Sequence, residues 1–173
     1  MQKEKNRPAI KWAIYYAILL VLFVMQTTPN FLEFFSFKPI FVLPICVCVC
    51  MFEDVLPSGI FCVITGLLWD LSSNKLFGFN AIILLACGVF ISLLCIYYLH
   101  TKLTNSILFS TIVLAIQGLL DYLFYYLIWG YKDSHLILLK HIFPNAIYTI
   151  IVGIPIYFLI LKISKKFHIV NRA

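Results

Sequence analysis

The segment GLLWDLSSNKLFGFN, which runs from Gly66 to Asn80, joins the end of one apolar run to the start of the next. The first run closes on an acid, Asp70, and the second begins at Asn80, after a short polar link and Gly78. An acid among long apolar runs is costly in lipid, so such residues face protein or water. The segment therefore predicts two antiparallel membrane helices, with Asp70 in the outer half of the membrane, near the link between them.

The composition of the whole chain also points to a membrane. Its 173 residues are 63% hydrophobic and 12% charged, whereas soluble domains average about 45–50% apolar and about 25% charged residues. Lipid offers the backbone no hydrogen bonds, and the apolar runs are long and continuous, so helices are favoured over barrel strands. We expect an all-α, polytopic membrane protein with a single transmembrane domain over residues 1–173.

Six apolar runs predict six transmembrane helices. Their approximate ranges are residues 12–28, 38–52, 57–71, 79–99, 107–129 and 142–161. The second run carries Pro44 and its apolar part reaches only about 21 Å at 1.5 Å per residue, which is short for a hydrocarbon core of about 30 Å. The first run follows a basic head and has no small-residue cleavage pattern after it, so we interpret it as an uncleaved anchor.

The distribution of basic residues predicts the orientation. With six spans, both ends of the chain and two turns share one side of the membrane, and that side holds nine of the thirteen Lys and Arg residues. Lys and Arg concentrate on the cytoplasmic side of membrane proteins, so we expect both termini in the cytoplasm. The basic residues lie between the apolar runs and at the two ends, not in one patch, and we expect no nucleic-acid partner.

Asp70 is expected to belong to a group of polar side chains in the outer half of the membrane. Counting 1.5 Å per residue places Asp70 about 20 Å and Asp121 about 21 Å from the inner ends of their helices. Each acid ends a helix stripe of small or polar residues with the same 0, 7, 11 spacing. These stripes are Gly59, Gly66 and Asp70, and Ser110, Gln117 and Asp121. The structural polar cluster that we predict consists of Asp70, Asn80, Gln117, Asp121 and Asn145.

Small residues and polar caps complete the expected packing. Close helix packing in lipid uses small residues, and the glycines expected to serve it are Gly59, Gly66, Gly78 and Gly153. For Asn80 alone, capping a helix is the alternative that we favour, and Asp70 has the alternative role of ending a helix in the headgroup layer. We expect Asp70→Asn to be mild, and we interpret Glu53 and Asp54 as a solvated turn.

The six cysteines all lie within apolar runs, at positions 46, 48, 50, 62, 87 and 95. Such positions are typical of small buried residues and not of a disulfide framework. In the CVCVC run Cys46 and Cys50 share a helix face, but Cys48 points away, and no histidine lies nearby. We therefore expect no disulfide, no bound metal and no cofactor.

Several function classes lack their motifs in this chain. Intramembrane aspartyl proteases use two aspartates but carry Gly-x-Gly-Asp, which precedes neither Asp70 nor Asp121, and Gly-x-Ser-x-Gly and His-Glu-x-x-His are missing. A channel would need a stripe of charged residues through the whole membrane, and the inner half has no such stripe. Two classes remain: a non-enzymatic scaffold, and a small-molecule-binding subunit of a transporter, in which kinked spans would form a pocket.

The segment GIFCVITGLLWDLSSNKLFGFNAIIL, from Gly59 to Leu84, resembles the MreD family of rod shape-determining membrane proteins. The shared pattern is a glycine and leucine before Asp70, a link of about seven residues, Gly78 and a new span. The resemblance covers essentially the whole chain, including LLDYLFYYLIW in the fifth run and PNAIYTIIVGIPIY in the sixth. The second span is shorter than the family pattern.

This resemblance implies a non-enzymatic role in the cell-elongation machinery, which synthesises peptidoglycan at the bacterial inner membrane. Proteins of this kind bind the bitopic protein MreC and help to position a polytopic glycosyltransferase and a class B penicillin-binding protein. The family fold is also similar to the six-helix substrate-binding subunits of energy-coupling-factor vitamin transporters. A vitamin-binding subunit of such a transporter is therefore the alternative function.

Overall fold

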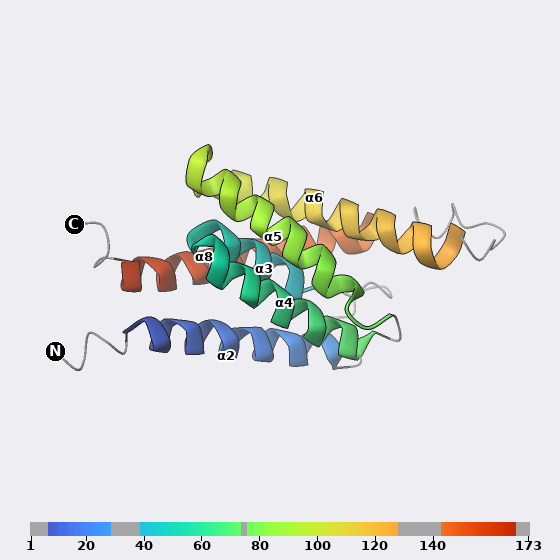
Figure 1. Cartoon of the computed structure of the whole chain (residues 1–173), viewed down its shortest axis with the longest axis horizontal. Helices are drawn as coiled ribbons and strands as arrows, with labels where there is room; N and C mark the ends of the chain where they lie inside the picture. The colour runs from blue at the N-terminus through green and yellow to red at the C-terminus, as the bar shows by residue number, and fades with distance from the viewer. Residues whose placement is uncertain (1–6, 29–38, 74–75, 128–142, 169–173) are drawn as a thin grey trace.

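The computed structural model describes residues 7–28, 39–73, 76–127 and 143–168 (Figure 1). The described elements are α2 (Arg7–Thr27), α3 (Val42–Phe52), α4 (Val55–Ser72), α5 (Phe79–Tyr97), α6 (Leu103–Asp121), the π-helical segment η1 (Tyr122–Leu127) and α8 (Phe143–His168). Five of these helices are long and apolar enough to cross a membrane, and α3 is the shorter one. The prediction of an all-helical polytopic membrane protein is confirmed.

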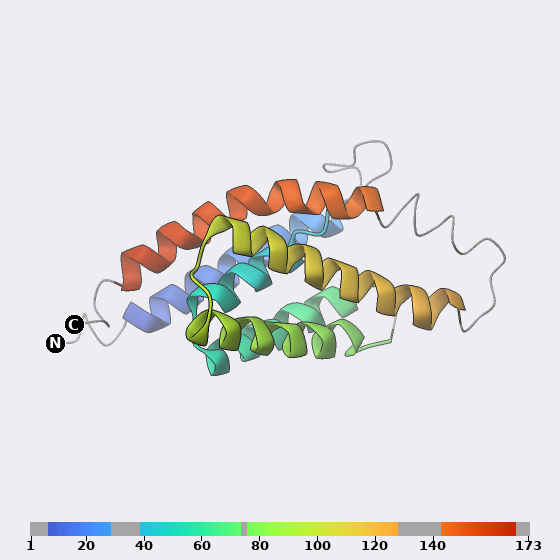
Figure 2. The ribbon, with the colours of Figure 1, turned by 90° about the horizontal axis from the view of Figure 1, so that it is seen from above.

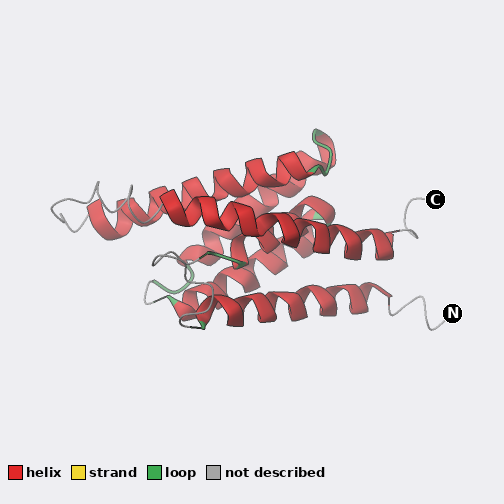
Figure 3. Cartoon of the chain, turned by 180° about the vertical axis from the view of Figure 1, so that it is seen from behind, coloured by secondary structure: helices red, strands yellow, loops and turns green. Residues whose placement is uncertain are grey.

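Successive helices run in opposite directions, so α2 begins and α8 ends at the same end of the bundle (Figures 1 and 2). We call this end the termini end and the opposite one the far end. Seen from behind, the described chain consists of helices joined by loops (Figure 3). The basic residues of the described ranges belong to the start of α2, the start of α6 and the last turns of α8, and they are Arg7, Lys11, Lys102, Lys162, Lys165 and Lys166.

The short helix α3 lies at the centre of the bundle. All residues from Val42 to Met51 are buried, and the helix packs against α2, α4, α5, α6 and α8. Its 11 residues reach about 16 Å, well short of a hydrocarbon core of about 30 Å. The regular helix thus starts at Val42, later than the expected start of the second span at residue 38, and it is surrounded by protein.

Side chains from other helices accept two main-chain N–H groups at the entry to α3. The N–H of Ile40 donates to Thr149 Oγ1 of α8 at 3.0 Å, and the N–H of Val42 donates to Gln26 Oε1 of α2 at 3.1 Å. The first amides of a helix have no partner within the helix, and lipid offers none. Residues of α2 and α8 therefore make it possible for α3 to begin inside the bundle.

The other end of α3 is fixed in a similar way. Ser92 Oγ of α5 donates to the carbonyl of Cys50 at 2.9 Å, and it lies 2.8 Å from Ser58 Oγ of α4. These three groups are buried. They tie α3, α4 and α5 together near the termini end.

Helices α4 and α5 form the most closely packed pair. A Cβ at Gly66 would overlap the backbone of Ala81, whose nitrogen would lie 2.6 Å away. Gly59 has more room, since its Cβ would make an ordinary contact with Leu85 at 3.4 Å. The stripe that contains these glycines therefore faces α5, as helix packing in lipid requires of small residues.

The fifth apolar run differs from its expected range of 107–129. The helix α6 begins earlier, at Leu103, and its regular part ends at Asp121, where the π-helical segment η1 takes over. A π-helical turn widens the backbone spiral and is common at functional positions. The rest of the run, from residue 128, lies outside the described ranges. Asp121 thus occupies the junction between two helix types.

Candidate functional site

The carboxylate of Asp70 lies at the start of the next helix, α5. Its Oδ2 accepts the N–H of Gly78 at 2.8 Å and that of Ala81 at 3.4 Å, and its Oδ1 accepts the N–H of Asn80 at 3.2 Å. The side chain is 3% exposed. The first amides of a helix carry a partial positive charge that stabilises an anion. Asp70 of α4 therefore caps α5 across the helix–helix contact.

Gly78 makes this arrangement possible. It is the residue before the first turn of α5, and it has a φ of 93°, in the left-handed region. Glycine adopts this conformation without the strain of a Cβ. It has no side chain to cap α5, and the carboxylate of Asp70 supplies the missing acceptor.

Hydrogen bonds extend from Asp70 to α6. Asn80 Nδ2 donates to Asp70 Oδ1 at 2.8 Å, and Gln117 Nε2 lies 3.3 Å from both Asn80 Oδ1 and Asp121 Oδ2. Asn80 is 1% exposed and Gln117 is 5% exposed. The two amides thus connect the two acids and join α4, α5 and α6. We call Asp70, Asn80, Gln117 and Asp121 the far-end polar cluster.

The structure brings together four of the five residues expected in a polar group. The fifth, Asn145, belongs to α8, but its side chain lies outside the described part. Asn80 does not cap its own helix: the residue at the cap position of α5 is Gly78, and Asn80 Oδ1, the atom that could accept a backbone N–H, accepts from Gln117 Nε2. Of the remaining expected packing residues, Gly153 lies against Pro44 of α3, where a Cβ would be 3.4 Å from the proline ring.

A second buried polar group lies at the termini end, and the sequence interpretation of Glu53 as part of a solvated turn is wrong. Its side chain accepts a bond from Lys11 Nζ at 2.6 Å and from the Tyr15 hydroxyl at 2.9 Å, and the residue is 9% exposed. Asp54, next to it, is exposed as expected. Lys11 and Tyr15 are four residues apart on α2 and share a face, which is the signal that sequence reasoning missed.

Three cysteines form a further group that spacing alone did not reveal. The Sγ atoms of Cys46 and Cys50 on α3 lie 3.0 and 3.2 Å from the Sγ of Cys62 on α4. Cys48 points away from this group and lies 3.4 Å from Ser106 Oγ. The sequence argument compared only cysteines of one run, so it did not include the residue from the neighbouring helix. Within the described ranges, these three are the side chains placed to hold a metal ion together.

Comparison with known proteins assigns the family. A model of the family described as rod shape-determining protein MreD matches residues 6–167. The chain belongs to the MreD family. The resemblance found in the segment around Asp70 is therefore confirmed, whereas no curated protein and no solved structure gives a match.

Membership of the MreD family implies a role in determining rod cell shape and an association with the cell-shape machinery. MreD proteins are generally regarded as non-enzymatic morphogenesis proteins. In this MreD chain, Asp70 has a defined structural task, since its oxygens accept the N–H groups of Gly78 and Asn80 at the start of α5.

Proposed function

We propose that this chain is a non-enzymatic scaffold of the cell-elongation machinery, and that the far-end polar cluster fixes the shape of its helix bundle. The main support is the geometry of Asp70. Both of its oxygens accept donors from the start of α5, and three cavities in the described part of the chain are lined by residues other than the four of the cluster. An enzyme needs its reacting groups within reach of a substrate. The cluster is placed to hold helices together.

The proposed partners are the single-span protein MreC, and through it a polytopic glycosyltransferase and a class B penicillin-binding protein. Large apolar side chains of α2 are exposed on the bundle, such as Leu20, Val21 and Val24. Exposed apolar faces of membrane helices meet either lipid or the helices of other proteins. A rigid bundle presents such faces in a fixed arrangement.

We propose that all six helices cross the inner membrane with both termini in the cytoplasm. The basic residues at the termini end support this orientation, because Lys and Arg accumulate on the cytoplasmic side. The polar caps on α3 support the crossing of this short helix, since irregular backbone at membrane depth is tolerated where protein surrounds it. The far-end polar cluster then lies toward the outer leaflet.

Depletion in a rod-shaped host is the direct test of the proposed role. We expect depleted cells to become round, and we expect the tagged chain to co-purify with MreC. Asp70→Leu should fail to restore the rod shape and should lose MreC in parallel. Asp54→Asn is the matched control, because Asp54 is an exposed acid without a side-chain cap bond to its helix, and it should restore the shape.

The same experiment separates the alternative function. Depleted cells that keep their rod shape but lose the uptake of one vitamin would reject the scaffold and support a transporter subunit. Normal MreC binding by an Asp70→Leu chain that is well folded would reject the role given to the cluster and leave the scaffold intact.

A further inference from the structure

Cys46, Cys50 and Cys62 place three sulfur atoms at one point of the protein core. Two of the Sγ–Sγ distances are 3.0 and 3.2 Å, and all three atoms lie within 4.8 Å of one another. The side chains come from two helices and are at most 2% exposed. We propose that these three cysteines bind one Cu(I) ion.

The surrounding helices leave room for this sulfur group and hold it in place. A Cβ at Gly88 of α5 would overlap Cys62 Sγ and would come within 3.0 Å of Cys50 Sγ. Because Gly88 has no side chain, the sulfur atoms of Cys50 and Cys62 can occupy this space. The bond from Ser92 of α5 to the carbonyl of Cys50, which is one of the three proposed ligands, fixes α3 against α5 at the site.

The donor set determines the kind of ion. Soft sulfur ligands select Cu(I), zinc or iron–sulfur clusters, and an iron–sulfur cluster is usually held by four cysteines. Structural zinc sites are almost always tetrahedral with four ligands, whereas the described residues offer three, all of them sulfur. If one cysteine loses its proton to water and binds Cu(I) as a thiolate, while the other two bind through their protonated sulfur atoms, the site has no net charge. This matters in a dry interior, where an uncompensated charge is costly.

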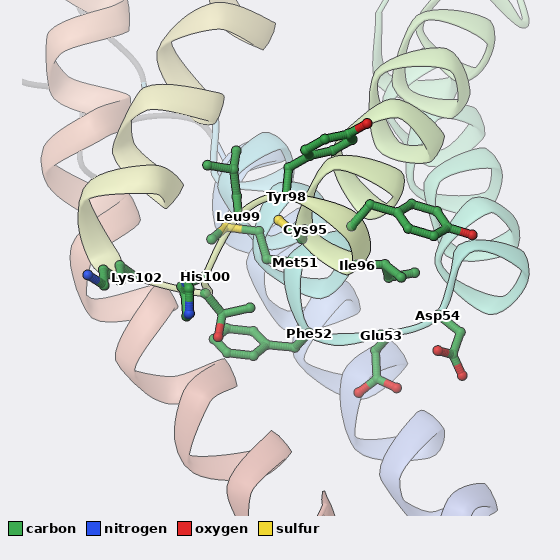
Figure 4. A pocket seen from close by; sticks show the side chains of 12 residues that line it. Met51, Phe52, Glu53, Asp54, Cys95, Ile96, Tyr98, Leu99, His100 and Lys102 are labelled. Atoms are coloured by element: carbon green, nitrogen blue, oxygen red, sulfur yellow. The ribbon is translucent and has the colours of Figure 1, made fainter.

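Further sulfur-containing side chains lie in the same core cluster and at the termini end. A cavity of about 720 Å³ opens between the α3–α4 and α5–α6 turns, and Met51 and Cys95 contribute to its lining (Figure 4). Met51 follows Cys50 in the chain, and Cys87 and Cys95 pack against the core cluster that contains all three proposed ligands. Thioether and thiol sulfurs are soft ligands, so this cavity is the entry route that fits the ion.

The test uses the full chain, purified in detergent under anaerobic conditions with ascorbate as reductant and titrated with the coloured Cu(I)–bicinchoninate complex. We expect the chain to withdraw one equivalent of Cu(I), and X-ray absorption to find only sulfur around the ion. Cys62→Ser should weaken Cu(I) binding by more than about tenfold, as the loss of a ligand should exceed the effect of losing a supporting residue. Cys48→Ser is the matched control from the same run and should bind like the natural chain.

Three results would overturn the proposal: no withdrawal of Cu(I) by the natural chain, an equal loss in the Cys48 and Cys62 variants, or nitrogen and oxygen ligands in the absorption spectrum. Size-exclusion profiles establish that each variant is folded. If Cys62→Ser does not fold, Cys50→Met serves in its place. It keeps a soft sulfur, so it should retain Cu(I) binding while Cys50→Leu loses it, and equal binding by both would also reject the site.

Discussion

Replacing Asp70 by leucine removes the acceptor of four donors, three of them buried and the fourth half-buried. These are the main-chain N–H groups of Gly78, Asn80 and Ala81 and the side-chain amide of Asn80. Two of the four bonds are short, at 2.8 Å, and the others are 3.2 and 3.4 Å. Leaving a buried donor without a partner costs about 1–3 kcal/mol. Counting the two short bonds alone, Asp70→Leu should lower the free energy of unfolding by about 2–6 kcal/mol.

The structure changes the expectation for Asp70→Asn. Each carboxylate oxygen accepts two donors, but an asparagine has only one oxygen and turns an NH2 group toward the other pair. One short bond is therefore lost in either amide orientation, and the cost should be about 1–3 kcal/mol. The structure therefore predicts a measurable loss of stability for Asp70→Asn, whereas the sequence predicted a mild effect.

Unfolding of the purified chain in detergent, followed by fluorescence during heating and by titration with a denaturing detergent, measures both variants. We expect the order natural chain, Asp70→Asn and Asp70→Leu, from most to least stable. Asp54→Asn, the exposed control, should change the free energy by less than about 0.5 kcal/mol, as is usual for surface substitutions. An Asp70→Leu chain as stable as the natural one would refute the capping role of Asp70.

Three further predictions concern packing, charge and orientation. Gly66→Ala should sharply reduce the folded yield in size-exclusion chromatography, because its Cβ would overlap the backbone of α5. Gly59→Ala should be tolerated. Equal yields of the two variants would contradict the packing argument. Lys11→Ala should cost about 3 kcal/mol in thermal unfolding, since it removes the cation paired with the buried side chain of Glu53 and leaves only the Tyr15 hydroxyl bond. Adding Glu53→Gln should recover part of this loss. A reporter that works only in the cytoplasm should be active when it is fused after Ala173. Activity of a reporter that works only in the periplasm, fused at the same place, would reject the proposed orientation.

Helix periodicity was sufficient to predict which residues belong to the far-end polar cluster. The rise per residue places Asp70 and Asp121 at one depth, and the 0, 7, 11 spacing puts Gln117 on the stripe of Asp121. In the structure Asn80 and Gln117 connect the two acids. Periodicity does not determine which atoms bond. The capping of α5 by Asp70 depends on the path of the chain through the turn and on the left-handed Gly78.

Contacts between side chains of different helices could not be predicted from the spacing of residues within one helix. Glu53 follows α3 in the sequence and looks like part of an exposed turn, but α2 places Lys11 beside it. Cys62 meets Cys46 only because α3 and α4 pack together at that level. Both groups depend on how helices pair, which single-sequence patterns do not fix.

The hydrogen bonds that α8 and α2 supply at the start of α3 affect the order in which this protein can fold. Ile40 finds its acceptor on Thr149, which the ribosome delivers more than a hundred residues later, in the last helix. Until α8 has entered the bilayer, the beginning of α3 has an amide with no partner in lipid, and the helix is too short to span on its own. The centre of the bundle is therefore completed last, and a nascent or truncated chain without α8 has an open core that quality-control proteases can recognise.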